Sequence, residues 1–438
     1  MAKVFSPTWF NERAPGLKAM YRKHMLEYYA PKNFNVMYVF GSLALLVLVN
    51  QIVTGIFLAM FYDPSANIAF GGVSQAFASV QYIMRDVDWG WLIRYMHTTG
   101  ASMFFIVIYL HMFRGLMYGS YKRPRELVWT LGMLIFLVLM AEAFMGYVLP
   151  WGNMSFWGAK VIISLFGAIP WVGNTLVEWI MGVVGGTAPS GATLNRFFAL
   201  HVVALPLVLL LLVVLHLAAL HEVGSNNPEG VDVKHGPKGN RWSPDAPKDG
   251  IPFHPYYTVK DIMGVGFFLL ICAFVIFMAP RMGGFFIEHE NFAPANVLTT
   301  PSSIKPVWYF SPFYAILRSI PAKGPGILAL LVSIVALFLV PWLDRGKVKA
   351  VRYRGVGYKV ALTLFVIAFL ILGLIGAEVT PAILHGLLGP NIDLISWQHW
   401  IGWICMFFYY GFFVFLWAYT FFGWEKTKPV PERVTSHE

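Results

Sequence analysis

Eight apolar stretches constrain this chain more than any other feature. Each holds about 20 consecutive residues with few charges, enough to cross a bilayer core of roughly 30 Å. Only 12% of the 438 residues are charged and 58% are hydrophobic, whereas a soluble domain has roughly 25% charged residues. The sequence therefore predicts an all-α, multi-pass membrane protein. The expected spans are 36–61, 91–118, 127–150, 193–221, 259–280, 325–343, 357–377 and 397–423.

The distribution of charge predicts the orientation of these spans. A net charge of +10 is compatible with nucleic-acid binding, but the basic residues concentrate in the two termini and in alternate loops. The positive-inside rule then puts both termini in the cytoplasm and indicates no nucleic-acid partner. The long outer segments 62–90, 150–192 and 281–324 contain short apolar stretches that we interpret as interfacial helices.

Two spans carry a histidine at each end of an apolar stretch. "HTTGASMFFIVIYLH" runs from His97 to His111, and "HVVALPLVLLLLVVLH" runs from His201 to His216. Both spans run inward, so His97 and His201 share an outer depth while His111 and His216 share an inner one, about 21 Å away at roughly 1.5 Å per residue. A bond to a neighbouring carbonyl explains one intramembrane histidine. Four at matched depths favour the axial ligands of two haems.

Glycines repeat with a similar period in the spans that run outward. Gly41 and Gly55 lie 14 positions apart, as do Gly132 and Gly146. Gly55 and Gly146 then lie at the outer depth, and the other two at the inner depth. Glycine allows another body to approach the backbone closely, which suits a flat macrocycle. Helix packing is the alternative explanation.

The special polar residues of the membrane fall in the first four spans. This predicts a dihaem-binding four-helix domain at 1–222 and a C-terminal domain at 223–438. Arg94, Arg114 and Arg196 lie three to five positions from the histidines. Either they neutralise haem propionates or they anchor the spans at the interface.

Several segments of the sequence resemble those of the cytochrome b family, whose members are the haem- and quinone-carrying subunits of cytochrome bc complexes. Besides the histidine pairs, they are "GSLALLVLVNQIVTG", "GYVLPWGNMSFWGA", "LHEVGSNNPEG", "IPFHPYYTVKD" and "PVWYFSPFYAILRSIP", and they extend over nearly the whole chain. The resemblance implies two non-covalent haems b between an outer quinol-oxidising site and an inner quinone-reducing site. It implies a bacterial ubiquinol–cytochrome c reductase of the cytoplasmic membrane, with a Rieske iron–sulfur protein and a c-type cytochrome as partners, in a dimeric complex.

The resemblance also implies roles for single residues. The outer histidines match the ligands of the low-potential haem, and the inner ones match those of the high-potential haem. The aromatic residues matched to the quinol-oxidising pocket are Tyr147, Tyr309 and Tyr314. The residues matched to the inner quinone pocket are Ser42, His221, Ser225, Lys260 and Asp261. An imidazole and a carboxylate near water suit proton uptake by a quinone, although "HEVGSNNP" alone is equally typical of a helix exit.

Two positions depart from the family pattern. The family more often has glutamate, a proposed proton acceptor, where this chain has Val307. Glu142 lies one turn before Gly146, and an intramembrane carboxylate is costly and usually functional. We expect Glu142 to accept the quinol proton. The alternatives are a packing carboxylate, or proton transfer through Tyr309 or water.

The second departure is the spacing of 15 positions between His201 and His216. It resembles the photosynthetic relatives of the family, whose cytochrome b is split into two chains, unlike this one.

Two other functions are compatible with parts of the pattern. A transporter could relay protons through the histidines and Glu142, and it would bind no haem. A simple dihaem anchor for a dehydrogenase would leave the segment 306–321 and four spans without a purpose. A visible absorption spectrum distinguishes the transporter from the haem protein.

Overall fold

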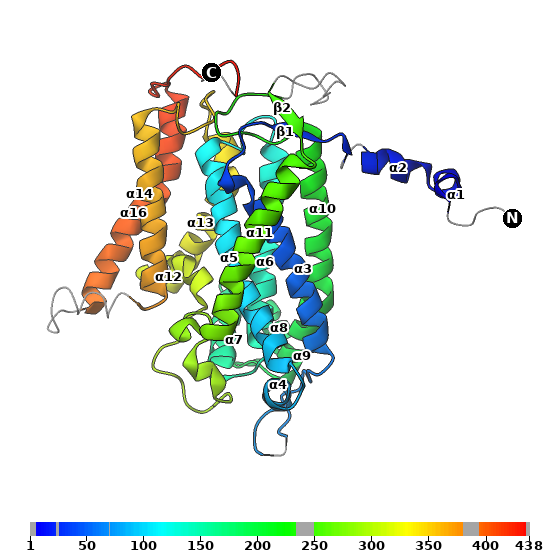
Figure 1. Cartoon of the computed structure of the whole chain (residues 1–438). Helices are drawn as coiled ribbons and strands as arrows, with labels where there is room; N and C mark the ends of the chain where they lie inside the picture. Colours follow the sequence, from blue (N-terminus) through cyan, green and yellow to red (C-terminus); the bar gives the residue numbers. More distant parts are fainter. Residues whose placement is uncertain (1–5, 23–25, 70, 234–248, 380–393, 435–438) are drawn as a thin grey trace.

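The framework of the molecule is a bundle of long helices (Figure 1). The computed structural model describes residues 6–22, 26–69, 71–233, 249–379 and 394–434. Within these ranges, eight helices are long and apolar enough to cross a membrane, which confirms the predicted all-α fold. Helices suit hydrocarbon because they satisfy their backbone hydrogen bonds internally. The eight long helices are Val36–Ala59 (η2, Val36–Tyr38, with α3, Phe40–Ala59), α5 (Gly90–Tyr118), α6 (Glu126–Val148), Gly191–Val223 (α9, Gly191–Ala199; η3, Leu200–Ala204; α10, Leu205–Val223), α11 (Tyr256–Met278), α13 (Lys323–Leu343), α14 (Val356–Gly376) and α16 (Leu394–Phe421).

Shorter elements connect these helices. In their described residues, the long segments predicted to lie outside the membrane contain short helices and no helix long enough to span it. Ser74 begins α4 by accepting a hydrogen bond from the Phe77 amide, and a capping box of Ser190 and Thr193 begins α9. The shorter helices are α1 (Pro7–Arg13), α2 (Pro15–Tyr21), α4 (Gln75–Arg85), α7 (Asn153–Phe166), α8 (Gly173–Met181), α12 (Ser311–Ser319), η4 (Met282–Gly284), η5 (His289–Phe292) and η6 (Trp308–Phe310).

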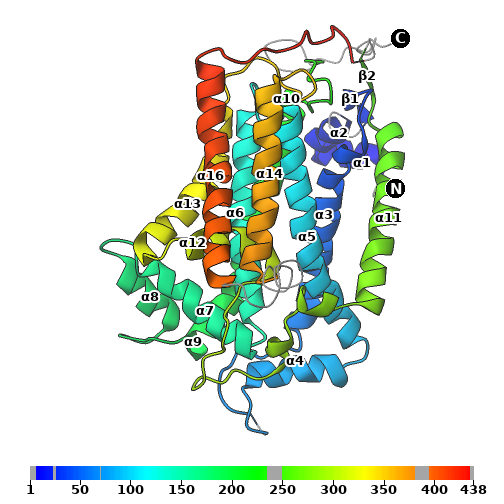
Figure 2. The same cartoon turned by 90° about the vertical axis from the view of Figure 1, so that its left-hand side faces the viewer.

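The two ends of the bundle are built differently. At one end, strand β1 (Tyr29–Pro31) pairs antiparallel with β2 (Gly250–Pro252), and the chain's C-terminal segment crosses nearby. At the opposite end lie α4, α7, α8 and the start of α9 (Figure 2). Following the predicted orientation, we call these the inner end and the outer end. The basic segment 234–248, used in the orientation argument, lies outside the described residues.

One span departs from a regular α-helix. A π-helical turn at Leu200–Ala204 contains His201, and Pro206, which has no N–H to donate, follows at the start of α10. A π-turn accommodates one additional residue in a helix. This explains how His201 and His216, 15 positions apart, keep the same two depths as the pair on α5, which is 14 positions apart.

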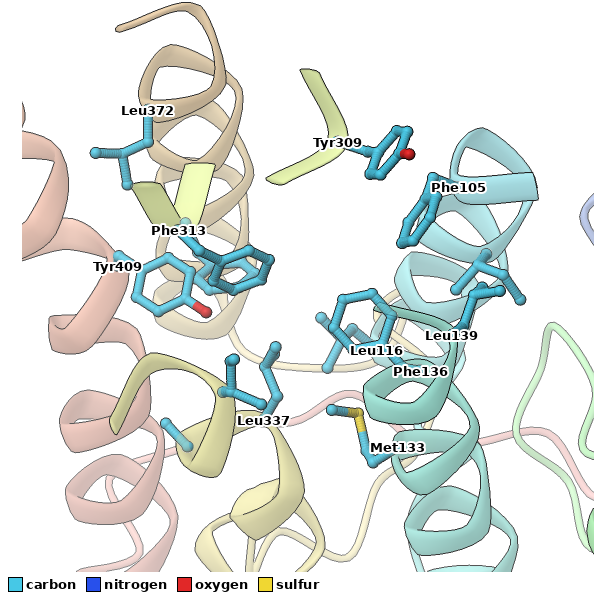
Figure 3. Close-up of a cluster of buried hydrophobic side chains, with 14 of the residues drawn as sticks. Phe105, Leu116, Met133, Phe136, Leu139, Tyr309, Phe313, Leu337, Leu372 and Tyr409 are labelled. Carbon is cyan, nitrogen blue, oxygen red and sulfur yellow. The ribbon is translucent and has the colours of Figure 1, made fainter. Parts of the chain in front are cut away.

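The main apolar core joins the two halves of the chain (Figure 3). The helix α3 packs on α5, and α6 packs on α10, while α12, α14 and α16 pack on one another. Phe105 and Phe136 from the first half meet Tyr309, Phe313 and Tyr409 from the second half in one buried cluster. This contact holds the segment after Pro306 against α5, which carries His97 and His111, and against α6.

Candidate functional site

The four histidines meet in two pairs inside the bundle. The ring centroids of His97 and His201 are 6.2 Å apart, and those of His111 and His216 are 6.4 Å apart. Imidazole–metal bonds are roughly 2 Å long, so each pair leaves room for one metal ion between its rings. Within the described ranges, no group of three or more His, Cys, Asp or Glu side chains suits a metal ion. A pair of histidines is a ligand set by which a protein can hold a haem iron.

Each of the four predicted glycines faces one histidine. An added Cβ would lie 3.5 Å from the His111 ring at Gly41 and 3.2 Å from the His97 ring at Gly55. At Gly132 it would lie 3.3 Å from the His216 ring. The glycines and histidines therefore share depths as the sequence predicted, and three of these positions leave little or no room for a side chain.

Gly146 is the tightest of the four positions. A Cβ there would lie only 2.4 Å from Cε1 of His201, far inside van der Waals contact. Alanine at this position would have to displace the imidazole or the backbone of α6.

Both outer histidines have a hydrogen-bond partner that fixes the tautomer. Nδ1 of His201 donates to the Glu142 carbonyl at 2.9 Å. Thr54 donates its hydroxyl hydrogen to the Asn50 carbonyl at 2.6 Å, and it therefore accepts from Nδ1 of His97 at 2.9 Å. With the hydrogen on Nδ1, Nε2 keeps its lone pair free for a metal.

The inner histidines lack side-chain partners. In the described part of the chain, Nδ1 of His111 and of His216 is buried and has no side-chain hydrogen-bond partner, and the ring of His216 has only the backbone of Val128 as an acceptor. Arg114, one turn along, lies over the ring of Tyr38 at 4.7 Å, and its Nε is also buried without a partner. Buried polar atoms without partners are uncommon, and here they indicate a site that accepts a polar group.

The three predicted arginines are placed differently. Arg94 lines the cavity beside His97, and Arg114 lies at the inner pair. Arg196 instead lies over the ring of Trp179 at 5.1 Å and donates to the Trp179 carbonyl. This arrangement favours the anchoring alternative for Arg196.

One large cavity opens from the outer histidine pair. Its volume is about 410 Å³, within the range typical of small-molecule sites. It runs from the two histidines to side chains of α6 and of the segments 286–291 and 307–309. The lining residues used below are His97, His201, Glu142, Tyr147, Glu288 and Tyr309.

Tyr147 and Glu288 form a pair in the wall of this cavity. The Tyr147 hydroxyl donates to Oε2 of Glu288 at 3.2 Å. Glu288 is only 6% exposed, and burial raises the pKa of its carboxyl to about 7. A carboxyl with a pKa near 7 in an apolar cavity is suited to proton transfer.

The other residues predicted for the outer pocket are distributed unevenly. The Tyr309 ring stacks on Phe105 at 4.0 Å and lines the cavity (Figure 3). Val307 is buried at 4% exposure and also lines it. Tyr314 donates to the Ile304 carbonyl at 2.7 Å and is not part of the lining.

Glu142 points toward a histidine. Its Oε1 lies 3.0 Å from Nδ1 of His201, and its Oε2 is buried without a hydrogen-bond partner among the residues that the structure describes. The carboxylate therefore belongs to the surroundings of His201 as well as to the cavity wall.

The residues predicted for the inner pocket form two groups at the inner end. Ser42 donates to Asp261 at 2.6 Å, joining α3 to α11. Exposed Lys260 lies over the Tyr257 ring at 5.1 Å. No direct contact between these residues and the second group, His221 with Ser225, is seen in the part of the chain that is described.

Tyr28 connects the residues of that second group. Its ring stacks on the imidazole of His221 at 4.3 Å and 4°, and its hydroxyl lies 3.2 Å from the Ser225 hydroxyl. The backbone next to Tyr28 is held by the β1–β2 pair, where the Phe253 amide donates to the Tyr28 carbonyl at 2.8 Å.

Comparison with known proteins identifies the family of this chain. The family model described as "Cytochrome b/b6/petB" matches residues 25–224, and the model described as "Cytochrome b(C-terminal)/b6/petD" matches residues 294–389. The chain belongs to the cytochrome b family.

Relatives with this name match over almost the whole chain. Cytochrome b of Allochromatium vinosum is 54% identical over 438 residues, which is 99% of each chain. Cytochrome b of Rhodospirillum rubrum is 47% identical, over 98% of this chain and 95% of the relative. A chain of the solved structure "Hyperthermophilic respiratory Complex III" matches with a TM-score of 0.79 and 35% identity, over 95% of this chain and 98% of the other.

Family membership implies that this cytochrome b binds haem b, and the residues present fit that group. The paired histidines, the glycines facing them and the buried partnerless atoms near the inner pair are the features that a flat, metal-containing cofactor with charged side groups requires.

Sequence reasoning missed three residues of the site. Glu288 was missed because it lies in an irregular loop, although an acidic residue in an apolar stretch of an outer segment was a usable signal. Thr54 lies one position before Gly55, a common place for a small polar residue in a span. Tyr28 precedes the first span and carried no signal of its own.

Proposed function

We propose that this cytochrome b oxidises quinol at its outer end. One of the two electrons would leave through the Rieske iron–sulfur protein, and the other would cross the membrane to quinone at the inner end. The observation that carries the proposal is the outer cavity, in which a histidine pair and a buried Tyr147–Glu288 pair lie in one enclosure. A redox cofactor and a proton acceptor for the same substrate need to be close together.

Two haems b would be held by these histidines, one by His97 with His201 and one by His111 with His216. When bound, they supply one-electron redox chemistry. The protein sets the depth of the ligands and holds the outer pair in the tautomer with the hydrogen on Nδ1. A glycine facing each ring leaves room beside it. The division into a dihaem domain at 1–222 and a C-terminal domain at 223–438 stays a prediction.

Glu288 is the proposed proton acceptor of the outer site. Quinol releases protons as it is oxidised, and Val307 has no group that accepts one. With a pKa of about 7, Glu288 is able both to take and to release a proton near neutral pH. Tyr147 holds its carboxylate by donating a hydrogen bond. The prediction that Glu142 takes this proton remains untested.

The inner pocket would deliver protons to the reduced quinone. Asp261, held by Ser42, and His221 are proton carriers within reach of the inner surface. Ser225 and Lys260 complete the proposed pocket, and Tyr28 covers His221.

The relatives support a proposal for the assembly. The structural match is part of a respiratory complex III. We propose that this chain likewise works in a bacterial ubiquinol–cytochrome c reductase, with a Rieske iron–sulfur protein, a c-type cytochrome and a second copy of the complex. Its place would be the bacterial cytoplasmic membrane, with both termini in the cytoplasm.

A redox titration of the purified complex, followed by visible absorption, tests the proposal. We expect two b-type components with different midpoint potentials. A protein that binds no haem would favour the proton-relay transporter instead.

The proton acceptor is tested by Glu288→Gln, compared with Glu142→Gln. Below pH 7 the Glu288 carboxyl is largely protonated and cannot accept a proton, so parental quinol oxidation should rise as the pH rises through about 7. Glu288→Gln should slow quinol oxidation at least tenfold and remove this rise, with both haems retained. A parental rate and pH profile in Glu288→Gln, with a tenfold loss in Glu142→Gln, would return the role to Glu142.

A further inference from the structure

The outer ligand His201 has an anionic neighbour of its own. Its Nδ1 donates to the Glu142 carbonyl at 2.9 Å, while Oε1 of the same residue lies 3.0 Å from that nitrogen. Glu142 therefore contacts the ring of His201 through both its backbone and its side chain.

The position of this carboxylate is costly for the protein. Oε2 of Glu142 is buried and has no hydrogen-bond partner among the described residues. Leaving a buried acceptor of a charged group unsatisfied costs free energy. A side chain that only filled space would not require this cost, so the placement of a negative charge beside His201 needs a reason.

A carboxylate next to a ligating imidazole changes the metal that the imidazole binds. It increases electron donation by the ring and so raises the basicity of the ligand. Its negative charge also favours the more positive, oxidised state of a nearby metal, and the low effective dielectric constant of a protein interior strengthens the effect. Hydrogen bonding to axial ligands is one of the means by which proteins set haem potentials.

We infer that Glu142 is a positioning residue that orients His201 and lowers the midpoint potential of the outer haem. This inference rests on the proposed function, because it requires a haem at the outer pair. The other histidines serve as internal references. His97 has only a neutral hydroxyl, from Thr54, and the inner pair has no side-chain partner at Nδ1 in the described residues.

The other charged residues in the cavity lining do not substitute for Glu142. Arg94 carries the opposite charge, and Glu288 is engaged by Tyr147. Among the described residues of this lining, Glu142 alone combines a negative charge with direct contact to a ligand ring.

The experiment is a redox titration of the whole complex with Glu142→Gln, which keeps the length of the side chain and removes its charge. We expect the outer haem potential to rise by at least 59 mV, a tenfold change for a one-electron couple, while the inner haem potential stays in place. Glu142→Asp should stay near the parental value. If the Glu142→Gln variant does not incorporate haem, Glu142→Ala provides the same test, because it also removes the charge.

Glu288→Gln is the matched control, because it removes a carboxylate from the same cavity without touching a ligand. It should move the outer potential by much less than Glu142→Gln. An unchanged outer potential in Glu142→Gln, or equal shifts in both variants, would overturn the inference. Absence of an outer haem in the parental protein would instead overturn the proposed function.

Discussion

The outer and inner histidine pairs use the same ligands but have different surroundings. Both outer rings have hydrogen-bond partners at Nδ1, and one has a carboxylate beside it. Within the described chain, neither inner ring has a side-chain partner there, and His216 has only the backbone of Val128. The outer pair opens into a cavity of about 410 Å³, whereas the inner pair lies near an arginine that covers Tyr38.

The difference shows how one repeated motif gives two distinct redox sites. The rise of the helix sets where the ligands are, but neighbouring helices decide the charge and the hydrogen bonds around them. A difference in potential between two sites gives electron transfer between them a direction, and the asymmetry around Nδ1 is a physical source for such a difference.

Removing one ligand from each pair should have the largest effect. His97→Leu is expected to abolish the outer haem and His111→Leu the inner one, because each pair lies at its own depth. Reduced-minus-oxidised spectra of the two variants would each lack a different b-type component. Loss of the same component in both variants would show that the histidines are not paired by depth as proposed.

The facing glycines should come next, with unequal effects. Gly146→Ala places a Cβ 2.4 Å from the His201 ring, while Gly41→Ala places one 3.5 Å from the His111 ring. We expect Gly146→Ala to remove most of the outer haem and Gly41→Ala to reduce the inner haem less. Haem content per protein, measured by pyridine haemochrome and spectral deconvolution, tests this order, and the reverse order would contradict it.

Changes in the inner pocket should affect one end only. Asp261→Asn removes the carboxylate held by Ser42 and should slow reoxidation of the inner haem by quinone several-fold, leaving quinol oxidation intact. Stopped-flow or flash kinetics separate the two steps. Unchanged inner reoxidation would exclude Asp261 from proton delivery.

The smallest effect is expected at Tyr28. Tyr28→Phe keeps the ring stacked on His221 but removes the hydroxyl near Ser225, so a change of about twofold or less in the quinone concentration for half-maximal inner reoxidation is expected. Tyr28→Leu removes the stacking and should give a larger change. Equal effects from the two variants would indicate that the ring has no role in holding His221.

Periodicity explains what the sequence predicted well. The spans, the matched depths of the histidines and the facing glycines all follow from one helix geometry, in which residues separated by a fixed number of positions recur at a fixed depth. The departure at His201 was visible as a 15-position spacing, but the π-turn that absorbs it was not, because its register depends on neighbouring helices and on Pro206.

Contacts between distant segments were decided only by the tertiary structure. Glu288 meets Tyr147 across 141 positions, and nothing periodic links them. The basic loop residues that predicted the orientation include Arg354, whose side chain is fully buried and pairs with Asp344 at 2.7 Å. Burial alone would raise the pKa of that Asp344 carboxyl, but Arg354 and Lys122 hold it below its ordinary value.

By itself, the sequence determined which helices form and at what depth each ligand lies, since both are properties of one helix. Which charges lie beside those ligands was decided by packing, because a charge acts through distance in space and not through separation along the chain.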